Sequence, residues 1–290
     1  MSEPIVVPDA VLAHEHVLVD FGGVVSPGSY DADEVFGLAL PKLAEAYSLG
    51  CRRLLECTPN HLGRDPALLA RLADASGIDI WTNTGVYGAA DRVGVPSYAR
   101  ELTAEQLAAR FVAEHRDGIA GMRPRFIKTA VRDGALEDLD RTLVRAAALA
   151  SRETGLTVAS HTTAGVAAVQ QLELFAEVGV PAERFVWVHA QAEQNPEFHE
   201  RVARAGAWVE FDGLRPGAVE WQRRCVERMA AAGLLGRTLV ANDSGWYHVG
   251  EEGGGEFLGY TFLHTDLLPL LDRSWHRQLL VDNPTAAFGA

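Results

Sequence analysis

The feature that most constrains the fold is the alternation of short apolar segments with longer helical stretches. The short segments are rich in β-branched or aromatic residues, as buried strands are, and they are 11–16, 53–57, 78–86, 125–130, 157–161, 185–189, 207–211 and 238–241. The clearest helical stretches are 103–115, 135–154, 165–178 and 219–232, and the last three end at a glycine, as helices often do. Strands that alternate with helices predict a parallel α/β fold.

Two architectures satisfy this alternation, an open doubly wound sheet and a closed barrel. An open sheet usually carries a glycine-rich turn after its first strand, whereas here the first strand ends in His14-Glu15-His16, and Gly22 and Gly23 follow without that motif. The count of eight strands also favours the barrel. The sequence therefore predicts a (β/α)8 TIM barrel that forms a single domain over residues 1–290, a length that suffices because such barrels need roughly 250 residues.

Charge and composition restrict the partners. The formal net charge of −13 repels nucleic acid, and no dense basic patch offsets it. No apolar run approaches the roughly 20 residues of a membrane span, and residues 1–9 lack the features of a signal peptide. Three cysteines without a C-x-x-C motif fit a reducing compartment. We expect a cytoplasmic protein with a small-molecule substrate, no nucleic-acid or membrane partner, and a homodimer as its assembly.

The residues at the carboxyl ends of the predicted strands carry chemistry, which is where TIM barrels place their active sites. These residues are His14, His16, Lys128, His161, His189 and Asp243. Taken singly, each has an ordinary structural interpretation: a histidine that only forms hydrogen bonds, a lysine that reaches solvent, or an aspartate that caps a helix. Together, four of the ten histidines end three strands and an acid ends the eighth, and this coincidence favours a metal site.

The H-x-H motif gives this site a geometry. Residues two apart on a strand point to the same side, so His14 and His16 enter the barrel and Glu15, a structural residue, points away. Paired imidazoles suit Zn, Mn, Fe or Co. Adding His161 and His189 makes the cluster too rich for one ion, so it predicts two divalent cations.

Lys128 stands where a carboxylate would be expected. An ammonium group beside two cations is repelled, and a neutral lysine amine can react with carbon dioxide. The resulting carbamate is an anionic oxygen ligand that can bridge two metals. We therefore interpret Lys128 as a carbamylated ligand.

The ordered set of motifs resembles the phosphotriesterase-like branch of the amidohydrolase superfamily. It runs from Leu12-Ala13-His14-Glu15-His16 through Phe126-Ile127-Lys128, Ser160-His161-Thr162, Val188-His189-Ala190 and Asn242-Asp243-Ser244 to Asn283-Pro284-Thr285-Ala286-Ala287-Phe288. The resemblance implies a (β/α)8 barrel with a binuclear metal centre, zinc being expected first and Mn, Co or Fe as alternatives.

The resemblance also implies a role for each ligand. His14, His16 and Asp243 would bind the more buried metal, His161 and His189 the more exposed one, and carbamylated Lys128 would bridge them with a hydroxide. Asp243 would be the catalytic residue that accepts a proton from this nucleophile.

The sequence departs from the family pattern at two places. Many relatives carry a charged residue, often an aspartate, close after the sixth-strand histidine, where this chain has Ala190-Gln191-Ala192-Glu193-Gln194. Some relatives have a histidine at the position of Asn242. The transfer of a substrate from any named relative is therefore open.

Three further residues are candidates for substrate binding: Tyr87, Arg215 and Trp246. Tyr87 could donate to a substrate oxygen or only pack, and Arg215 could bind an anionic group or form a surface ion pair. We interpret residues 250–260 as a mobile lid. His248, His264 and His276 are not expected to be ligands, because no predicted strand ends at them.

The expected reaction is the hydrolysis of a lactone by a metal-activated hydroxide. Hydrolysis of a phosphotriester or another phosphoester is the second possibility, and hydrolysis of a carboxylic ester or amide is the third. A barrel that binds a ligand and has lost catalysis is the non-enzymatic alternative. Retention of all six ligand positions argues against it, since a binding protein need not keep Lys128 or Asp243.

Overall fold

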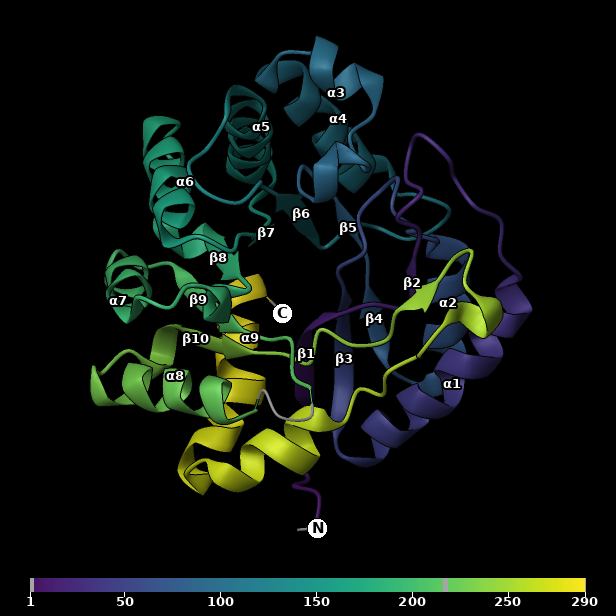
Figure 1. The fold of residues 1–290 in the computed structure, drawn as a ribbon, viewed down its shortest axis with the longest axis vertical. Helices are drawn as coiled ribbons and strands as arrows, with labels where there is room; N and C mark the ends of the chain where they lie inside the picture. The colour runs from purple at the N-terminus through teal and green to yellow at the C-terminus, as the bar shows by residue number, and fades with distance from the viewer. Residues whose placement is uncertain (1–2, 216–218, 290) are drawn as a thin grey trace.

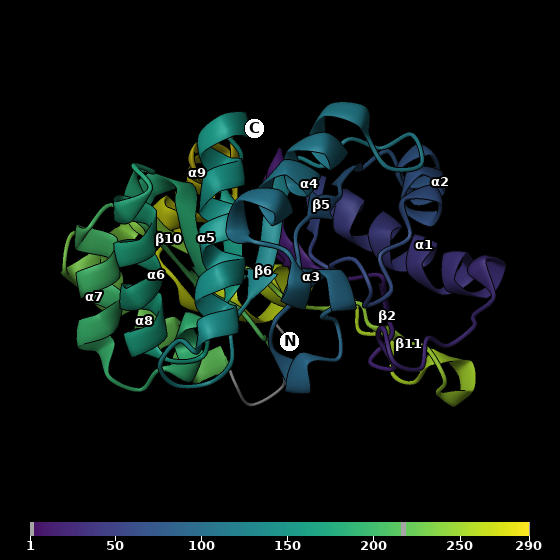
Figure 2. The ribbon, with the colours of Figure 1, turned by 90° about the horizontal axis from the view of Figure 1, so that it is seen from above.

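The computed structural model describes residues 3–215 and 219–289. The parallel strands around its centre are β1 (Ala10–Glu15), β3 (Cys51–Glu56), β4 (Asp79–Trp81), β5 (Asn83–Thr84), β6 (Phe126–Ala130), β7 (Val158–His161), β8 (Phe185–Val188), β9 (Trp208–Phe211) and β10 (Thr238–Val240). The main helices are α1 (Ala32–Ser48), α2 (Pro66–Ser76), α3 (Ser97–Glu101), α4 (Ala104–Asp117), α5 (Asp138–Thr154), α6 (Gly165–Glu177), α7 (Pro196–Arg204) and α8 (Val219–Ala231). These helices surround the strands (Figure 1). In the view at right angles, the helices again lie outside the strands (Figure 2).

The strands close into a barrel. Parallel pairing runs in the order β1-β3-β4 and, across the short break at Thr82, from β5 through β6, β7, β8 and β9 to β10. The last gap is closed by backbone hydrogen bonds between β1 and the segment after β10, from Asp243 N to His14 O (3.0 Å) and from His16 N to Ser244 O (2.8 Å). The predicted (β/α)8 architecture is confirmed. The expected third strand, 78–86, is divided into β4 and β5.

The helix boundaries follow local capping. Thr103 and Gln106 form the predicted capping box at the start of α4. The helix expected over 135–154 starts instead at Asp138, because Glu137 and Asp140 form a capping box there and the Leu136 backbone N–H donates to the Gln170 side chain. Gly155, in a left-handed conformation, ends this helix as expected.

The chain after β10 departs from the regular strand–helix repeat. Its next element is the two-residue strand β11 (Tyr247–His248), which pairs with β2 (Leu18–Val19). Short helical turns follow, and the described chain ends with α9 (Asn283–Phe288). The expectation that a helix directly follows every strand is therefore wrong for the eighth strand, and His248 does lie on a strand.

Two apolar layers hold the barrel. Alternate strand side chains such as Leu54 and Ile127 face the helices, whereas Val11, Phe126 and Val186 form a smaller inner cluster. Phe288 of α9 joins the inner cluster, with 5.8 Å between its ring centroid and that of Phe126. No helix among the described residues is long and apolar enough to span a membrane.

Candidate metal centre

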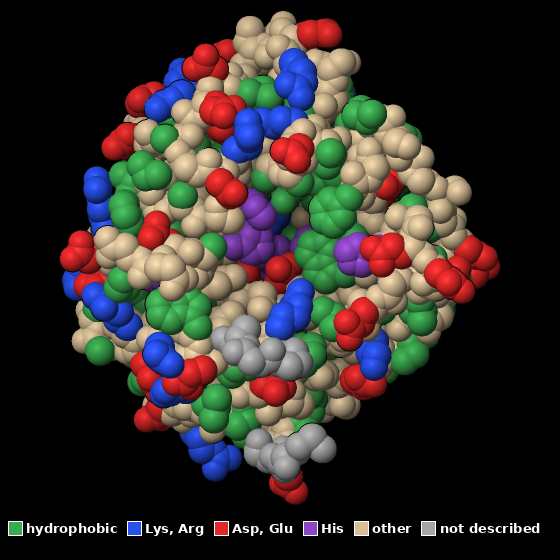
Figure 3. All heavy atoms as spheres, viewed as in Figure 1, with side chains coloured by type: hydrophobic (Ala, Val, Ile, Leu, Met, Phe, Trp, Pro, Cys, Tyr) green, Lys and Arg blue, Asp and Glu red, His purple; other side chains and the backbone are tan. Residues whose placement is uncertain are grey.

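A cavity of about 340 Å³ lies at the carboxyl ends of the strands, and all six predicted ligands line it together with Tyr87 and Trp246. Figure 3 shows histidine side chains on the floor of this hollow, with apolar side chains beside them. Arg215 lies outside this cavity and lines a neighbouring one of about 440 Å³, which shares Phe21 and Trp246 with the first. The cluster predicted from the strand ends is therefore brought together by the fold.

Three predicted ligands converge most closely. His14 Nε2 lies 3.2 Å from His16 Nε2, and Asp243 Oδ1 lies 3.3 Å from His16 Nε2 and 3.9 Å from His14 Nε2. These three side chains form a group that could hold a metal ion. Asp243 Oδ1 is buried and has no hydrogen-bond partner among the described residues. A buried, partnerless carboxylate oxygen facing two imidazole nitrogens is the donor set that a divalent cation completes.

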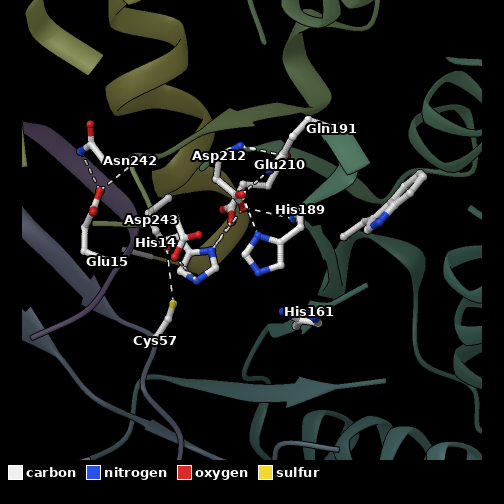
Figure 4. Close-up of polar contacts among 12 residues, drawn as sticks. His14, Glu15, Cys57, His161, His189, Gln191, Glu210, Asp212, Asn242 and Asp243 are labelled. Atoms are coloured by element: carbon white, nitrogen blue, oxygen red, sulfur yellow. Dashed lines mark hydrogen bonds and ion pairs between the residues drawn. The ribbon is translucent and has the colours of Figure 1, made fainter. Parts of the chain in front are cut away.

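The opposite ring nitrogens are held by neighbouring polar groups. His16 Nδ1 lies 2.8 Å from Thr58 Oγ1, His14 Nδ1 lies 2.9 Å from Glu210 Oε1, and His189 Nδ1 lies 2.7 Å from Asp212 Oδ1 (Figure 4). Acceptors at Nδ1 keep the proton there and leave the Nε2 lone pair free for the cavity.

Two of the histidines reach the cavity through local backbone irregularities. The register of β1 against β3 shifts between Leu12 and Glu15. Ala13 already belongs to the inner cluster, so strict alternation would turn His14 outward, but the shift places its side chain in the cavity. His189 has a φ of 64°. Such a conformation is uncommon outside glycine, and here it turns the side chain inward although Val188 before it also points inward.

Hydrogen bonds with side chains fix the backbone around Asp243 on two sides. Its own φ is 54°, and its carbonyl oxygen accepts hydrogen bonds from Arg215 Nη2 (3.0 Å) and Trp246 Nε1 (2.8 Å). On the other side, the buried Glu15 carboxyl group accepts hydrogen bonds from the backbone N–H groups of Asn242 and Ser244, at 3.1 and 3.0 Å, and from Asn242 Nδ2 at 2.8 Å. Glu15 points away from the cavity as expected, and it fixes the segment that presents Asp243.

The other predicted ligands, with Tyr87 and Trp246, also line the cavity. Lys128 is 1 % exposed, and its Nζ lies 3.3 Å from His14 Nε2. The rings of His161 and His189 meet edge to face with centroids 4.4 Å apart. Tyr87 Oη lies 3.3 Å from His161 Nδ1, so this hydroxyl lies close to a predicted ligand. Trp246 covers His16, with 3.8 Å between their ring centroids.

The electrostatics favour neutral imidazoles at His14, His16 and His161 in the metal-free protein. Burial, with the nearby Lys128 charge, lowers the pKa of His14 to about 3, and burial also lowers the pKa values of His16 and His161. Burial opposes the charge on His189 too, but Asp212 outweighs it and raises the pKa of His189. Neutral imidazoles carry the lone pairs that a metal requires.

The sequence analysis did not single out Glu210, Asp212 or Thr58. Burial, followed by the neighbouring Asp212 charge, raises the pKa of Glu210 well above its usual range. Asp212 is also buried, but the His189 charge and hydrogen bonds from His14 and His189 hold the pKa of Asp212 well below its usual range. The signal was available, because Glu210 is an acid in the otherwise apolar predicted strand 207–211, and Asp212, two residues on, directly follows that strand.

Comparisons with known proteins agree with this geometry. The profile of the phosphotriesterase family matches residues 8–288. The chain belongs to the phosphotriesterase family. The phosphotriesterase homology protein of Escherichia coli is 26% identical over 289 residues, which cover 96% of this chain and 97% of that protein.

Solved structures extend the family likeness to the fold. A variant of organophosphorus hydrolase from Deinococcus radiodurans is 26% identical, with a TM-score of 0.85 and coverage of 100% of this chain and 98% of that one. A second structure, from the engineering of organophosphate hydrolysis activity from a weak promiscuous lactonase template, is 25% identical with a TM-score of 0.84 over the whole of both chains. This member of the phosphotriesterase family is thus a hydrolase barrel with His and Asp groups that could bind metal.

Proposed function

We propose that this protein is a binuclear metal-dependent hydrolase whose natural substrate is a lactone. The observation that carries the metal-dependent part is the buried Asp243 Oδ1, which has no hydrogen-bond partner among the described residues and faces the Nε2 atoms of His14 and His16 on the cavity floor. Without a cation, this oxygen would pay the cost of burial without a partner.

The donor set fits two cations, zinc first and Mn, Co or Fe as alternatives. His14, His16 and Asp243 would hold one of them, and His161 with His189 the other. Lys128 Nζ lies 3.3 Å from His14 Nε2, so a carbamate on this nitrogen would supply the anion that two adjacent cations need. When bound, such a pair of cations lowers the pKa of a water molecule and polarises the scissile oxygen.

The protein's own residues then orient the reactants and move a proton. The Asp243 carboxylate would accept the proton of the nucleophile and deliver it to the leaving oxygen. The Arg215 and Trp246 donors hold the Asp243 carbonyl, which keeps this carboxylate in place. Tyr87 Oη is positioned to donate to a substrate oxygen near His161. Trp246 and Phe21 form an apolar wall that excludes water from the reacting group.

The cavity walls support a neutral ester as substrate. Among the described residues that line it, Lys128 is the one Lys or Arg, and apolar groups such as Val19, Phe21 and Leu62 make up much of the rest. A phosphate monoester dianion would find no guanidinium to bind there, whereas a lactone or a phosphotriester carries no charge. The lactone ranks first because a relative of this chain was built on a lactonase template. The phosphotriester ranks second because other relatives are organophosphorus hydrolases.

A substrate panel tests the proposal. The zinc-loaded protein is assayed with aliphatic, sugar and acyl-homoserine lactones, an activated phosphotriester, aryl esters and a phosphate monoester. We expect the highest kcat/KM with a lactone, weaker turnover of the phosphotriester, none of the monoester, and loss of all activity in Asp243→Ala. Fast phosphotriester hydrolysis without lactone turnover would reverse the ranking. Equal activity in the chelated protein would refute metal dependence.

A further inference from the structure

Beneath the cavity floor, Glu210 and Asp212 bring two buried carboxyl groups against the backs of two predicted ligands. Both acids come from β9 or its first following residue, and as residues two apart they enter the barrel on the same side. Glu210 is 1 % exposed and Asp212 is fully buried. Figure 4 shows them together beside His14 and His189.

Asp212 accepts its hydrogen bonds from His189 and from Gln191 beside it. Its Oδ1 atom accepts from His189 Nδ1 (2.7 Å) and Gln191 Nε2 (2.6 Å), and its Oδ2 atom accepts from the His189 backbone N–H (3.1 Å). The distance from Asp212 Oδ2 to His14 Nδ1 is longer, at 3.4 Å. Asp212 therefore holds His189 firmly and His14 only loosely.

Glu210 supplies the closer contact to His14. Its Oε1 atom lies 2.9 Å from His14 Nδ1, whereas its Oε2 atom is buried with no hydrogen-bond partner among the described residues. A buried carboxyl group with one unpaired oxygen is costly to bury. Among the described residues, the Glu210 side chain hydrogen-bonds to the back of a predicted metal ligand, and the Asp212 carboxyl group is a second polar neighbour.

We propose that Glu210 is a positioning residue that fixes His14, through Nδ1, for the metal bound by His14, His16 and Asp243. Asp212 does the same for His189 and the other metal. The carboxyl group keeps the His14 proton on Nδ1 and the ring in one orientation, so that Nε2 faces the cavity. This inference rests on the proposed metal centre, but it assigns Glu210 to one of the two metals rather than to both.

Three variants separate this role from packing. Glu210→Gln keeps an acceptor oxygen for Nδ1, and Glu210→Leu removes it at similar volume. Thr82→Val is the control, because Thr82 is also buried with an Oγ1 that has no hydrogen-bond partner among the described residues, and it does not line the cavity. Zinc is the probe, added to metal-stripped full-length protein at buffered free concentrations, with bound zinc counted by elemental analysis.

The wild type is expected to bind two zinc ions. In Glu210→Leu, we expect one of the two affinities to fall by about 10- to 100-fold, as when other partners of metal-bound histidines are removed. Glu210→Gln and Thr82→Val should stay within about threefold of the wild type at both sites. The metal-stripped Glu210→Leu protein should unfold at a urea concentration no lower than the wild type, since Leu removes a buried acid.

Other results overturn the assignment. Unchanged zinc affinities in Glu210→Leu contradict it, and so does an equal loss in Glu210→Gln, because that variant keeps the acceptor. A Glu210→Leu protein that loses stability and both affinities together shows a packing role instead. Failure of the wild type to bind zinc, Mn, Co or Fe refutes the metal centre itself and the assignment of Glu210 with it. A wild type that binds metal beside an unchanged Glu210→Leu variant refutes the assignment alone.

Discussion

Replacement of Glu15 by leucine tests how the fold holds the segment of the eighth-strand ligand. The carboxyl group of Glu15 accepts three hydrogen bonds, two from Asn242 and one from the Ser244 backbone, on either side of Asp243. Leucine leaves three buried donors without an acceptor. Each unpaired donor costs about 1–3 kcal/mol of folding free energy. Leucine also removes the cost of burying the acid, which offsets part of this sum.

We therefore expect Glu15→Leu to lower the free energy of unfolding by about 3–5 kcal/mol. This is a large share of the roughly 5–15 kcal/mol that stabilises a typical folded protein. The assay is urea denaturation of the metal-stripped protein, followed by circular dichroism. The exposed Glu173→Gln is the control, with an expected change within about 0.5 kcal/mol. A Glu15→Leu protein within 1 kcal/mol of the wild type (roughly one lost hydrogen bond) would refute the reasoning.

Three further predictions concern the site. The pKa of His14 is lowered from 6.5 to about 3 by burial and by Lys128, so neutral His14 contributes to the stability of the metal-stripped protein above pH 6.5. About 2 kcal/mol of this contribution is lost between pH 6.5 and 5. Thermal unfolding in chelator measures the loss, and a melting temperature constant over that range contradicts it. Asp243→Asn should lower kcat by about 10²- to 10⁴-fold on the best substrate of the panel, and a loss below tenfold contradicts its role as proton acceptor. Thr58→Val leaves His16 Nδ1 without its partner and should weaken one zinc site by about 10-fold, as equilibrium dialysis would show.

The sequence predicted the barrel and its ligand cluster because both follow from periodic patterns. Strand ends of a closed parallel barrel meet at one face, so His161 on β7 and Lys128 on β6 had to approach each other once the strands were recognised. Within the H-x-H motif, alternation gave the relative directions of the side chains, with His14 and His16 on one side and Glu15 on the other. These conclusions needed only the order of the elements.

The parts that the sequence left open depend on exceptions to periodicity. The register shift in β1 and the left-handed backbone of His189 turn two histidines inward, and alternation cannot foresee either. The contact of Glu210 with His14 joins residues 196 positions apart. Arg215 stays a predicted substrate residue, and the structure adds that its guanidinium donates to the backbone carbonyls of residues 214, 242 and 243. Such contacts require the coordinates of the folded chain.

The metal content of the purified protein tests the central claim most directly. Wild type and Lys128→Ala are prepared side by side with zinc in the medium, and bound metal is measured by elemental analysis per folded chain. We expect about two divalent ions per wild-type chain and one or none in Lys128→Ala, with similar circular dichroism spectra. A folded wild-type protein that holds no divalent metal, even when zinc, Mn, Co or Fe is supplied, would contradict the account.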